Sequence, residues 1–428
     1  MDMDQDPSRQ QEHEAGDYYP RIAFLSSRPR HGGSQAILLR LLQGHRARGA
    51  WGHGLAPGEF DLLSRARREG NPASAVKLHA SLLAYGGALM RLPPWQLALR
   101  ILRSAPGYSF RLWRFLRIHR VDLIYAAESR AALLALAAAK LAGVPILLHY
   151  QGGDSRENLR LAKLAMRHAI RIVTVSEAVR DDLHIQLPTL PREKTVTVHN
   201  GLPDLPAWPI NFHTENLVLL FVGRLSPQKG VHHLLEALAL LSPKLITRVT
   251  LRVVGEDPEG SYLSLLKQRA VDLGIEKRIH FLGFRDDVHN QMGEADLVLC
   301  PSVERERIVL GGIAVQVTSK EGFCLVAAEA MRAGRPVIAS RSFGLKEVVD
   351  DGRTGILVPP GNPDALARAI ALLADNRSKR IDMGREGRKR FEQYFTDSRM
   401  QDAFRREFAA ATGREQGVEL KSKSATAS

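Results

Sequence analysis

The sequence has 428 residues, of which 44% are hydrophobic and 25% are charged, so it is too long for one ordinary core and predicts two domains. Two cysteines, Cys300 and Cys324, are too few for a disulfide framework, and the polar start does not resemble a signal peptide, so we expect a reducing, cytoplasmic environment. The net charge of +14 favours an anionic partner, and because zinc-knuckle, RNA-binding and helix-turn-helix patterns are missing from the sequence, a phosphorylated small molecule or an acidic membrane is favoured over nucleic acid.

Strand and helix patterns alternate through the first half of the chain, after a polar head (1–19) that we expect to be disordered. The run RIAFLSS (21–27) predicts a strand, and the loop RHGGS then leads into an amphipathic helix. Gly32 and Gly33 in this loop would let backbone amides approach a ligand, although a simple turn at the start of a helix explains them almost as well. Three further strand-and-helix units follow, beginning with VDLIYAAES, VPILLHYQGGD and RIVTVSEAVRDDL, and KTVTVHNGLP then predicts a strand that meets an Asn-Gly turn.

The segment 93–120 is basic and aromatic. It interleaves Trp, Tyr, Phe and Leu with Arg100, Arg103, Arg111, Arg114, Arg117 and Arg120. Such a surface suits an anionic membrane or a polyprenyl-diphosphate acceptor. Binding to an anionic membrane would place the protein peripherally on the inner face of the plasma membrane. The alternative is an amphipathic helix packed beneath the next strand, with solvated arginines. The apolar stretch that follows is interrupted by Lys140, Gly143 and Pro145, so it predicts a helix and a buried strand rather than a membrane span.

A Pro-rich segment (200–215) interrupts this alternation and is interpreted as an interdomain linker. A second series of strand and helix patterns follows. The sequence therefore predicts an α/β protein with two doubly wound, Rossmann-like domains, residues 20–205 and 206–394, followed by a last helix (395–412) and a disordered tail (413–428). In such sheets ligands bind at the carboxyl ends of the strands, which directs attention to the loops found there.

The loop in FVGRLSPQKG (221–230) is the first of these in the second half. A strand ends at Gly223, and Arg224 and Lys229 flank a turn before a helix. Two cations beside free helix amides are suited to a diphosphate, although a pair of solvated surface charges has the same pattern. The turn lacks a Walker spacing, and no GxGxxG follows a strand, which disfavours a P-loop ATPase and a Rossmann dehydrogenase.

Two carboxylates, Glu321 and Glu329, lie eight positions apart in EGFCLVAAEA. Taken alone, they are explained by a buried helix with charged ends. They also suit opposite ends of one polar ligand, because eight residues of helical rise span about 12 Å.

GRLSPQKG, EGFCLVAAEAMRAGRPVIAS and VVDDGRTGILVPPGNPDALARAI together resemble the family 4 glycosyltransferases, which are retaining sugar-nucleotide transferases of GT-B fold. The resemblance covers residues 21–412 and is specific over 219–372. It implies that the two domains face each other across a cleft, that the last helix crosses back to the first domain, and that no cofactor is needed besides a UDP- or GDP-linked sugar.

The resemblance also assigns donor-site residues. Arg224 and Lys229 match the pair that grips the donor diphosphate, with Gly223 just before them. Glu321 matches the acid that binds sugar hydroxyls, and Glu329 the acid that accepts from the ribose. The backbone amides expected near the sugar and the phosphates are those of Gly322, Phe323, Cys324, Leu325 and Val326.

Other loops match the family less specifically. Phe284 and Arg285, in FLGFRDDV, occupy the positions that meet the nucleotide base, and an ordinary strand-to-helix turn is the alternative. Gly33 falls in the loop that faces the diphosphate from the first domain. Many relatives carry a catalytic His near residues 147–154, where His149 and Gln151 compete for the position; we favour His149.

Two departures from the family pattern stand out. Residues 303–320, VERERIVLGGIAVQVTSK, form an insertion before Glu321 that is expected to be a hairpin or a flap over the sugar pocket. Cys324 replaces a common glycine and is expected to be an inert buried thiol. No metal site is expected, because Arg, Lys and the helix dipole supply the positive charge.

The expected function is therefore retaining, metal-independent transfer of a sugar from a nucleotide-sugar donor to a lipid-linked or polysaccharide acceptor, in the synthesis of bacterial cell-surface polysaccharide, lipopolysaccharide or glycolipid. Two alternatives stay open. A nucleotide-sugar epimerase of similar fold should lack the Arg and Lys loop coupled to the paired acids, and a non-catalytic sugar-nucleotide-binding protein should have lost the diphosphate cations.

Overall fold

The computed structural model describes residues 19–29, 32–83, 93–152, 156–209, 216–257, 260–310, 312–318 and 320–413. Apart from Tyr19 and Gly413, the head and the tail that were expected to be disordered lie outside the described residues. The chain divides into two compact units. Unit 1 comprises Met1–His149, Arg156–Ile172 and Gln401–Ser428, and unit 2 comprises Tyr150–Ser155 and Val173–Met400.

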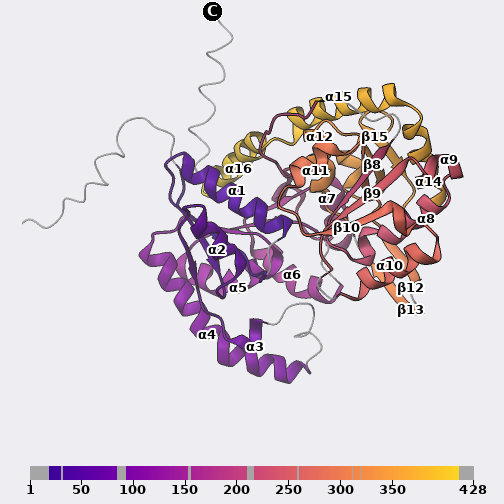
Figure 1. Cartoon of the computed structure of the whole chain (residues 1–428). Coiled ribbons are helices and arrows are strands. Elements are labelled where there is room, and N and C mark those ends of the chain that lie inside the picture. The colour runs from indigo at the N-terminus through magenta and orange to yellow at the C-terminus, as the bar shows by residue number, and fades with distance from the viewer. Residues whose placement is uncertain are drawn as a thin grey trace, which may run out of the picture. The chain divides into compact units, whose positions relative to one another are not determined.

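The first half of the chain forms a seven-stranded sheet with the order β3-β2-β1-β4-β5-β6-β7, and the strand pairs from β3 to β5 are parallel. Figure 1 draws this half of the chain in indigo to magenta. Strands β1, β4 and β5 are buried along their whole length, as expected for parallel strands covered on both faces. The strands are β1 (Ile22–Leu25), β2 (Gly52–Ala56), β3 (Ala73–Ala75), β4 (Leu123–Ala126), β5 (Ile146–Tyr150), β6 (Arg171–Thr174) and β7 (Thr195–Thr197).

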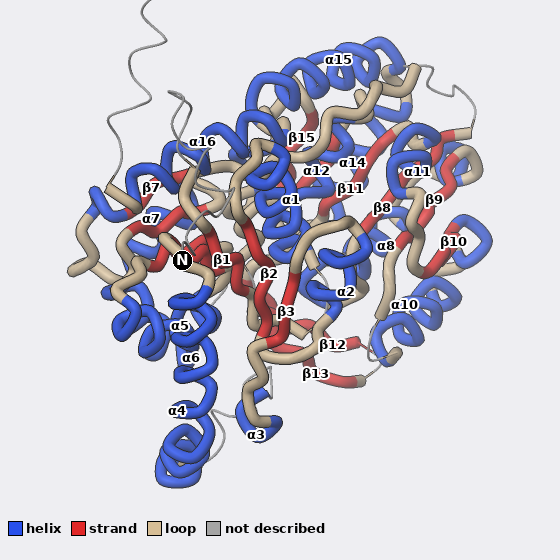
Figure 2. The backbone as a smooth tube through the Cα atoms, turned by 90° about the vertical axis from the view of Figure 1, so that its left-hand side faces the viewer, coloured by secondary structure: helices blue, strands red, loops and turns tan. Residues whose placement is uncertain are grey.

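Helices connect these strands (Figure 2). They are α1 (Gly33–Ala47), α2 (Asp61–Arg68), α3 (Ala80–Leu83), α4 (Pro94–Ile118), α5 (Ser129–Ala142), α6 (Arg156–His168), α7 (Glu177–Gln186) and the 3-10 turn η2 (Arg192–Lys194). A side chain caps the start of helix α7, because the Ser176 Oγ accepts a hydrogen bond from the Val179 amide at 3.2 Å.

The second sheet has six strands in the order β10-β9-β8-β11-β14-β15, with every neighbouring pair parallel. Its strands are β8 (Leu217–Val222), β9 (Val249–Val254), β10 (Ile279–Gly283), β11 (Leu297–Cys300), β14 (Val337–Ser340) and β15 (Gly355–Val358). In chain order this arrangement reads 3-2-1-4-5-6, the Rossmann order. The expectation of two doubly wound, Rossmann-like sheets is therefore confirmed.

The helices of the second half are α8 (Val231–Ala239), α9 (Pro243–Ile246), α10 (Ser261–Asp272), α11 (Val288–Glu294), α12 (Leu325–Arg332), α13 (Leu345–Val348), α14 (Pro363–Ala374), α15 (Arg377–Tyr394) and α16 (Asp397–Ala411), with 3-10 turns η3 (Pro227–Lys229) and η4 (Glu276–Arg278). Side chains cap three of them: Ser242 accepts from the Leu245 amide at 3.3 Å, Asn362 from the Ala365 amide at 2.8 Å, and Asn376 from the Lys379 amide at 2.9 Å.

The strand order of the second sheet reverses between β8 and β11, its first and fourth strands. Ligands of open α/β sheets bind outside the carboxyl ends of the strands at such a reversal. The residues that follow these two strands are Gly223–Gly230 and Pro301–Ser302, so the fold directs a ligand of unit 2 to these loops.

The insertion 303–320 is a β-hairpin, one of the two forms expected from the sequence. Strands β12 (Arg305–Leu310) and β13 (Ile313–Thr318) are antiparallel, with Leu310 paired to Ile313, and they form a sheet of their own (Figure 2). The base of the hairpin is fixed to the turn η3, because the Val303 amide donates to the Gln228 carbonyl at 2.9 Å.

Residues 173–205 group with unit 2, so the packing does not divide the chain at residue 205. The predicted linker is described up to residue 209, and the rest of it lies outside the described residues. Its first part is held by hydrogen bonds within unit 2: Arg388 donates to the Leu205 carbonyl at 2.7 Å, and the Leu202 amide donates to the Phe395 carbonyl at 2.9 Å.

The last helix, α16, contributes to the core of unit 1 from Gln401 onward. Phe404 and Phe408 are buried and lie against rings of the first sheet. The ring centroids of Phe404 and Tyr125 are 5.9 Å apart, and those of Phe408 and Phe24 are 6.2 Å apart. These edge-to-face contacts fasten α16 to the first sheet.

Candidate active site

The predicted diphosphate loop lies at the strand reversal of the second sheet. β8 ends at Val222, Gly223 and Arg224 follow, and Lys229 ends the 3-10 turn η3 immediately before α8. The Arg224 side chain is exposed, and within the described part of the chain it makes no hydrogen bond or ion pair. Its guanidinium is therefore available to an anionic ligand.

Lys229 and Glu321 meet at this edge although 92 positions separate them. The Lys229 Nζ lies 2.5 Å from the Glu321 Oε2, and the Ser302 hydroxyl donates to the same oxygen at 3.1 Å. Burial alone would lower the pKa of Lys229, but the Glu321 carboxylate outweighs burial and raises that pKa above its ordinary value. Lys229 is therefore cationic at neutral pH, and the Glu321 Oε1 accepts no hydrogen bond from any described residue.

Glu321 is followed by a buried turn that leads into α12. Gly322, Phe323 and Cys324 are buried, and Leu325 and Val326 form the first turn of the helix. No side chain caps this helix end, so its first amides are available to an acceptor such as a phosphate oxygen. Glu329 lies one turn further along α12 and is partly exposed.

Hydrogen bonds connect the loops that follow β8, β9 and β10. The Leu225 amide donates to the Glu256 carbonyl at 2.8 Å, and the Gly255 amide donates to the Gly283 carbonyl at 2.8 Å. These bonds extend the site from the cation loop to Phe284, whose side chain is 58% exposed. An exposed ring at this position can stack on a planar ligand.

Arg285, next to Phe284, is engaged by its own loop. Its Nε and Nη2 donate to the two carboxylate oxygens of Asp287 at 2.8 and 2.9 Å. This bidentate pair orients the guanidinium. Phe284 and Arg285 therefore lie on the same connected edge as Arg224, but Arg285 is already neutralised.

Two glycines allow the backbone to approach closely at this edge. Gly230 has φ +70°, and a Cβ there would lie 2.0 Å from the Pro301 carbonyl oxygen. Gly255 has φ +143°, and a Cβ there would lie 1.8 Å from the Gly223 carbonyl oxygen. Both conformations disfavour a side chain, so glycine is required at each position.

His149 lies in the core of unit 1. Its side chain is fully buried, its Nδ1 is 2.6 Å from the Tyr125 hydroxyl, and its ring meets Phe404 edge to face at 5.0 Å. Burial lowers the pKa of His149 to about 3. The His149 side chain thus has no exposed surface in this structure, and the catalytic role expected of it stays a prediction.

Gln151, the alternative to His149, belongs to unit 2, where its backbone lies against the turn before α12. A Cβ on Gly322 would come within 2.2 Å of the Gln151 carbonyl oxygen. The Gln151 backbone therefore lies beside the turn that is predicted to bind the sugar. Gly33, also predicted to face the donor, is exposed at the start of α1 in unit 1.

Both cysteines are buried and free. The pKa of the Cys300 thiol is raised well above its ordinary value. The hydrogen bond with Cys324 is the largest cause, and burial is the second. A thiol with a raised pKa stays protonated, so Cys300 is a poor nucleophile.

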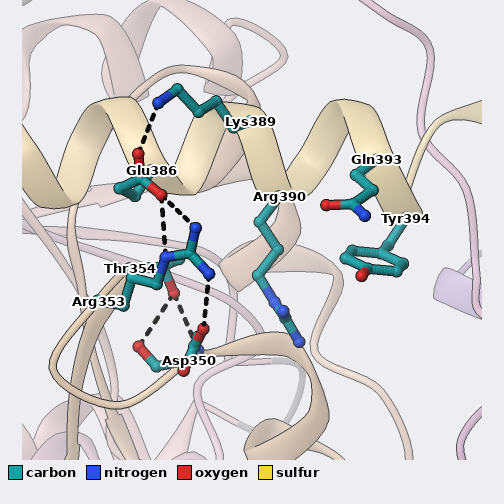
Figure 3. Close-up of a pocket in the computed structure, with 8 residues that line it drawn as sticks. All are labelled: Asp350, Arg353, Thr354, Glu386, Lys389, Arg390, Gln393 and Tyr394. Carbon is teal, nitrogen blue, oxygen red and sulfur yellow. Dashed lines mark hydrogen bonds and ion pairs between the residues drawn. The ribbon is translucent and has the colours of Figure 1, made fainter.

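A hollow elsewhere in unit 2 is unsuited to a nucleotide (Figure 3). It lies against α15, and its charged side chains satisfy one another: Arg353 pairs with Glu386 at 2.7 Å, and Lys389 pairs with the same carboxylate at 2.7 Å. None of the predicted donor residues lines it.

Sequence patterns did not identify two polar groups that the structure places in or near the site. Ser302 was visible only as part of a Pro-Ser pair after a strand, and its contact with Glu321 depends on the hairpin returning the chain to β11. Glu347 lies on α13 and accepts hydrogen bonds from the amides of Glu177 and Ala178 at 2.9 and 2.6 Å. No local spacing links such distant positions.

Comparisons with known families cover most of the chain. Residues 31–204 match the family model described as Glycosyltransferase Family 4, and residues 207–390 match the one described as Glycosyl transferases group 1. The division between the two matches falls at the Pro-rich segment, and the second match contains Arg224, Lys229, Glu321 and Glu329.

Curated relatives are similar over different lengths. Phosphatidyl-myo-inositol mannosyltransferase of Mycobacterium leprae (strain TN) is 28% identical over 377 residues, which span 84% of this chain and 89% of that protein. D-inositol 3-phosphate glycosyltransferase of Corynebacterium glutamicum (strain R) is 36% identical over 181 residues, 41% of this chain and 39% of that protein. An uncharacterized glycosyltransferase of Methanocaldococcus jannaschii is 28% identical, and the match spans 61% of that protein. The chain thus spans less than two thirds of the last two.

Among solved structures, Anabaena HepE in complex with UDP is similar at a TM-score of 0.73 and 25% identity, over 91% of this chain and all (100%) of that one. The same protein in complex with UDP-glucose is similar at a TM-score of 0.73 and 25% identity, over 91% of this chain and 100% of that one. Both comparisons show that this chain shares the overall fold of that protein.

Proposed function

The chain belongs to the family 4 glycosyltransferases, and on this basis we propose that it transfers a sugar, with retention of anomeric configuration, from a nucleotide-sugar donor to a lipid-linked or polysaccharide acceptor. The observation that carries the proposal is the meeting of Lys229, Glu321 and Ser302 beside the exposed Arg224, at the strand reversal of the second sheet.

The chemistry of each group suits one part of a nucleotide sugar. Arg224, Lys229 and the first amides of α12 would neutralise the diphosphate as it leaves the anomeric carbon, which is electrostatic stabilisation of a leaving group. The free Glu321 Oε1 would accept from a sugar hydroxyl while Oε2 stays bonded to Lys229. Because these cations supply the charge, we propose that transfer needs no divalent metal and no protein nucleophile.

The nucleoside end would lie along the hydrogen-bonded loops. Glu329, partly exposed on α12, would accept from the ribose hydroxyls, and Phe284 would stack on the base. The HepE complexes with UDP and UDP-glucose support a UDP-linked donor. The GDP-linked donor expected from the sequence remains the alternative, since the Phe284 face does not discriminate between bases.

The acceptor proposal is based on the M. leprae relative, whose name indicates a phosphatidyl-myo-inositol substrate, and on the surface of α4. Trp95, Leu99, Leu102 and Phe110 follow a helical spacing and are 67%, 43%, 71% and 59% exposed. Exposed arginines Arg103, Arg114 and Arg117 accompany them. We propose that this stripe binds an anionic membrane that holds the acceptor, because a peripheral helix pairs an apolar face with basic side chains. The described helices include none long and apolar enough to cross a bilayer.

The test is incubation of the purified chain with UDP- and GDP-sugars, with phosphoinositide and polyprenyl-phosphate vesicles as acceptors and EDTA present. We expect release of free nucleotide and a glycosylated lipid of unchanged anomeric configuration. Interconversion of the donor sugar would indicate the epimerase instead, and binding without either reaction would indicate a non-catalytic protein.

A pair of lysine variants ties the activity to the site. Lys229→Ala should lower kcat by about 10²–10³-fold, the usual effect of removing one preorganised charge. Lys244→Ala removes an exposed lysine from α9 and should leave kcat unchanged. Equal activity of the two variants, with both folded by circular dichroism, would remove Lys229 from the diphosphate site.

A further inference from the structure

Three potential metal ligands meet where the β12–β13 hairpin contacts α8. His232 and His233 begin this helix, and Glu306 lies on β12 (Figure 1). The His233 Nε2 is 2.8 Å from the Glu306 Oε2, the His232 Nε2 is 4.0 Å from the same oxygen, and one ligand atom from each residue lies within 4.8 Å of the others. Two imidazoles and a carboxylate at this separation are a set that holds Zn²⁺.

The other ring nitrogens point away from this meeting point toward hydrogen-bonding groups. The His232 Nδ1 is 2.6 Å from the Tyr262 hydroxyl on α10, and the His233 Nδ1 is 3.6 Å from the Glu236 Oε2. Glu236 is itself fixed by Arg269, whose Nη2 donates to it at 3.2 Å. Metal-ligating histidines are typically oriented in this way, with Nδ1 facing an oxygen and Nε2 facing the ion.

The Nε2 of His232 is a potential ligand atom that lacks a hydrogen-bond partner among the described residues. His232 is 3% exposed. A buried imidazole nitrogen without a partner carries a desolvation cost. A cation between Nε2 and the Glu306 carboxylate would supply the missing partner.

The site also has room for a fourth ligand. Glu306 retains 24% side-chain exposure, and the neighbouring backbone is that of Gly361. A Cβ on Gly361 would lie 3.6 Å from both the His233 Nε2 and the Glu306 Oε2. Because Gly361 contributes no side chain here, a water molecule would be able to complete a tetrahedral shell around the ion.

We propose that His232, His233 and Glu306 form a Zn²⁺ site that fastens the β12–β13 hairpin to α8. The site is separate from the proposed transfer chemistry. It acts on structure, because the hairpin base is bonded to Gln228, next to Lys229, and ends just before Glu321. Fixing the hairpin thus fixes the two chain segments that carry the Lys229–Glu321 pair. A simple His233–Glu306 ion pair without metal is the competing arrangement.

The experiment uses the full chain without an affinity tag, stripped with a chelator and then equilibrated with Zn²⁺. We expect one Zn²⁺ per chain by mass spectrometry of the metal content, a higher Tm with Zn²⁺ than without it, and a tetrahedral visible spectrum when Co²⁺ replaces Zn²⁺. Glu306→Gln and His233→Gln should each weaken Zn²⁺ binding by more than about 100-fold, and Tyr262→Phe by about 10–100-fold.

Two matched variants control for loss of any histidine or any carboxylate. His280→Gln and Glu276→Gln alter exposed side chains of unit 2 outside the cluster and should retain one Zn²⁺ per chain. The proposal is overturned if the wild-type chain binds no stoichiometric Zn²⁺, or if Glu306→Gln binds it as tightly as Glu276→Gln. If Glu306→Gln fails to fold, the Co²⁺ spectrum of the wild-type chain and the Tyr262→Phe affinity still decide the question.

Discussion

Glu347 shows how one carboxylate organises several segments of unit 2. It accepts from the Glu177 and Ala178 amides at the start of α7, and the His199 Nε2 lies 3.1 Å from its Oε2. Burial alone would raise the pKa of Glu347, but the hydrogen bonds from His199 and from the two amides outweigh burial and lower that pKa below its ordinary value of 4.5.

A lowered folded-state pKa stabilises the protein above the unfolded-state pKa, and this stabilisation is lost as pH falls through the folded-state value. Glu347→Gln should therefore reduce stability by about 1–3 kcal/mol at pH 7, and the difference should shrink as pH falls below about 4.5. Calorimetric Tm values at pH 7, 5.5 and 4 test this. Glu276→Gln, at an exposed position, is the control. A pH-independent difference for Glu347→Gln would contradict the assignment.

The predicted site residues differ in how far the local sequence determines where they lie. Arg224 and Lys229 were identifiable because a strand, a short turn and a helix determine where they lie, and the structure brings Lys229 to Glu321. The sequence could not decide between His149 and Gln151 because strands alternate faces: a shift of two residues keeps the face but moves the position along the strand. Only packing against Tyr125 and Phe404 reveals that the His149 ring is in the core.

At the level of elements, the η3 turn depends on Gly230. Two glycines of the second half have similar left-handed conformations, Gly230 at φ +70° and Gly274 at φ +68°. A Cβ on Gly230 would clash with the Pro301 carbonyl, whereas nothing lies within 4 Å of one on Gly274. Alanine at either position pays a backbone cost of about 1–2 kcal/mol.

A comparison of the alanine variants at Gly230 and Gly274 isolates the effect of the clash with the Pro301 carbonyl. Gly230→Ala should lower Tm further than Gly274→Ala and should also reduce transfer, because Lys229 precedes Gly230 and Ser302 follows Pro301. Thermal melts and initial rates of nucleotide release measure the two effects. Identical Tm values and full activity for both variants would show that the η3 turn accommodates a side chain and that the close approach to Pro301 is unimportant.

The hairpin shows what the sequence could predict of an element and what it could not. Its Val, Ile and Gly content indicated a hairpin, which the structure contains. Its attachment was not predictable, because Glu306 meets His233 across 73 positions and adjacent histidines on a helix give no metal-ligand spacing of their own. The sequence predicted a doubly wound sheet but not the order of its six strands, because the reversal between β8 and β11 follows from tertiary pairing.

For the whole molecule, the net charge of +14 and the exposed stripe on α4 lead to one expectation, binding to anionic vesicles. Leu102→Gln combined with Phe110→Gln should weaken partitioning at least about tenfold, since burying each side chain contributes about 1.5–3 kcal/mol. Ile185→Gln changes a residue of α7 that is 78% exposed and should have no effect. Sedimentation with vesicles rich in phosphatidylglycerol measures the partitioning.

Salt separates the two contributions to this binding. Raising the ionic strength shortens the Debye length from about 10 Å at 0.1 M to about 3 Å at 1 M, so it should weaken the attraction of Arg103, Arg114 and Arg117 to anionic lipid while leaving apolar insertion intact. The wild-type chain should thus retain part of its binding at high salt, whereas the double variant should lose nearly all of it. If both respond identically to salt, α4 does not insert, and the positive charge of the molecule alone accounts for the association.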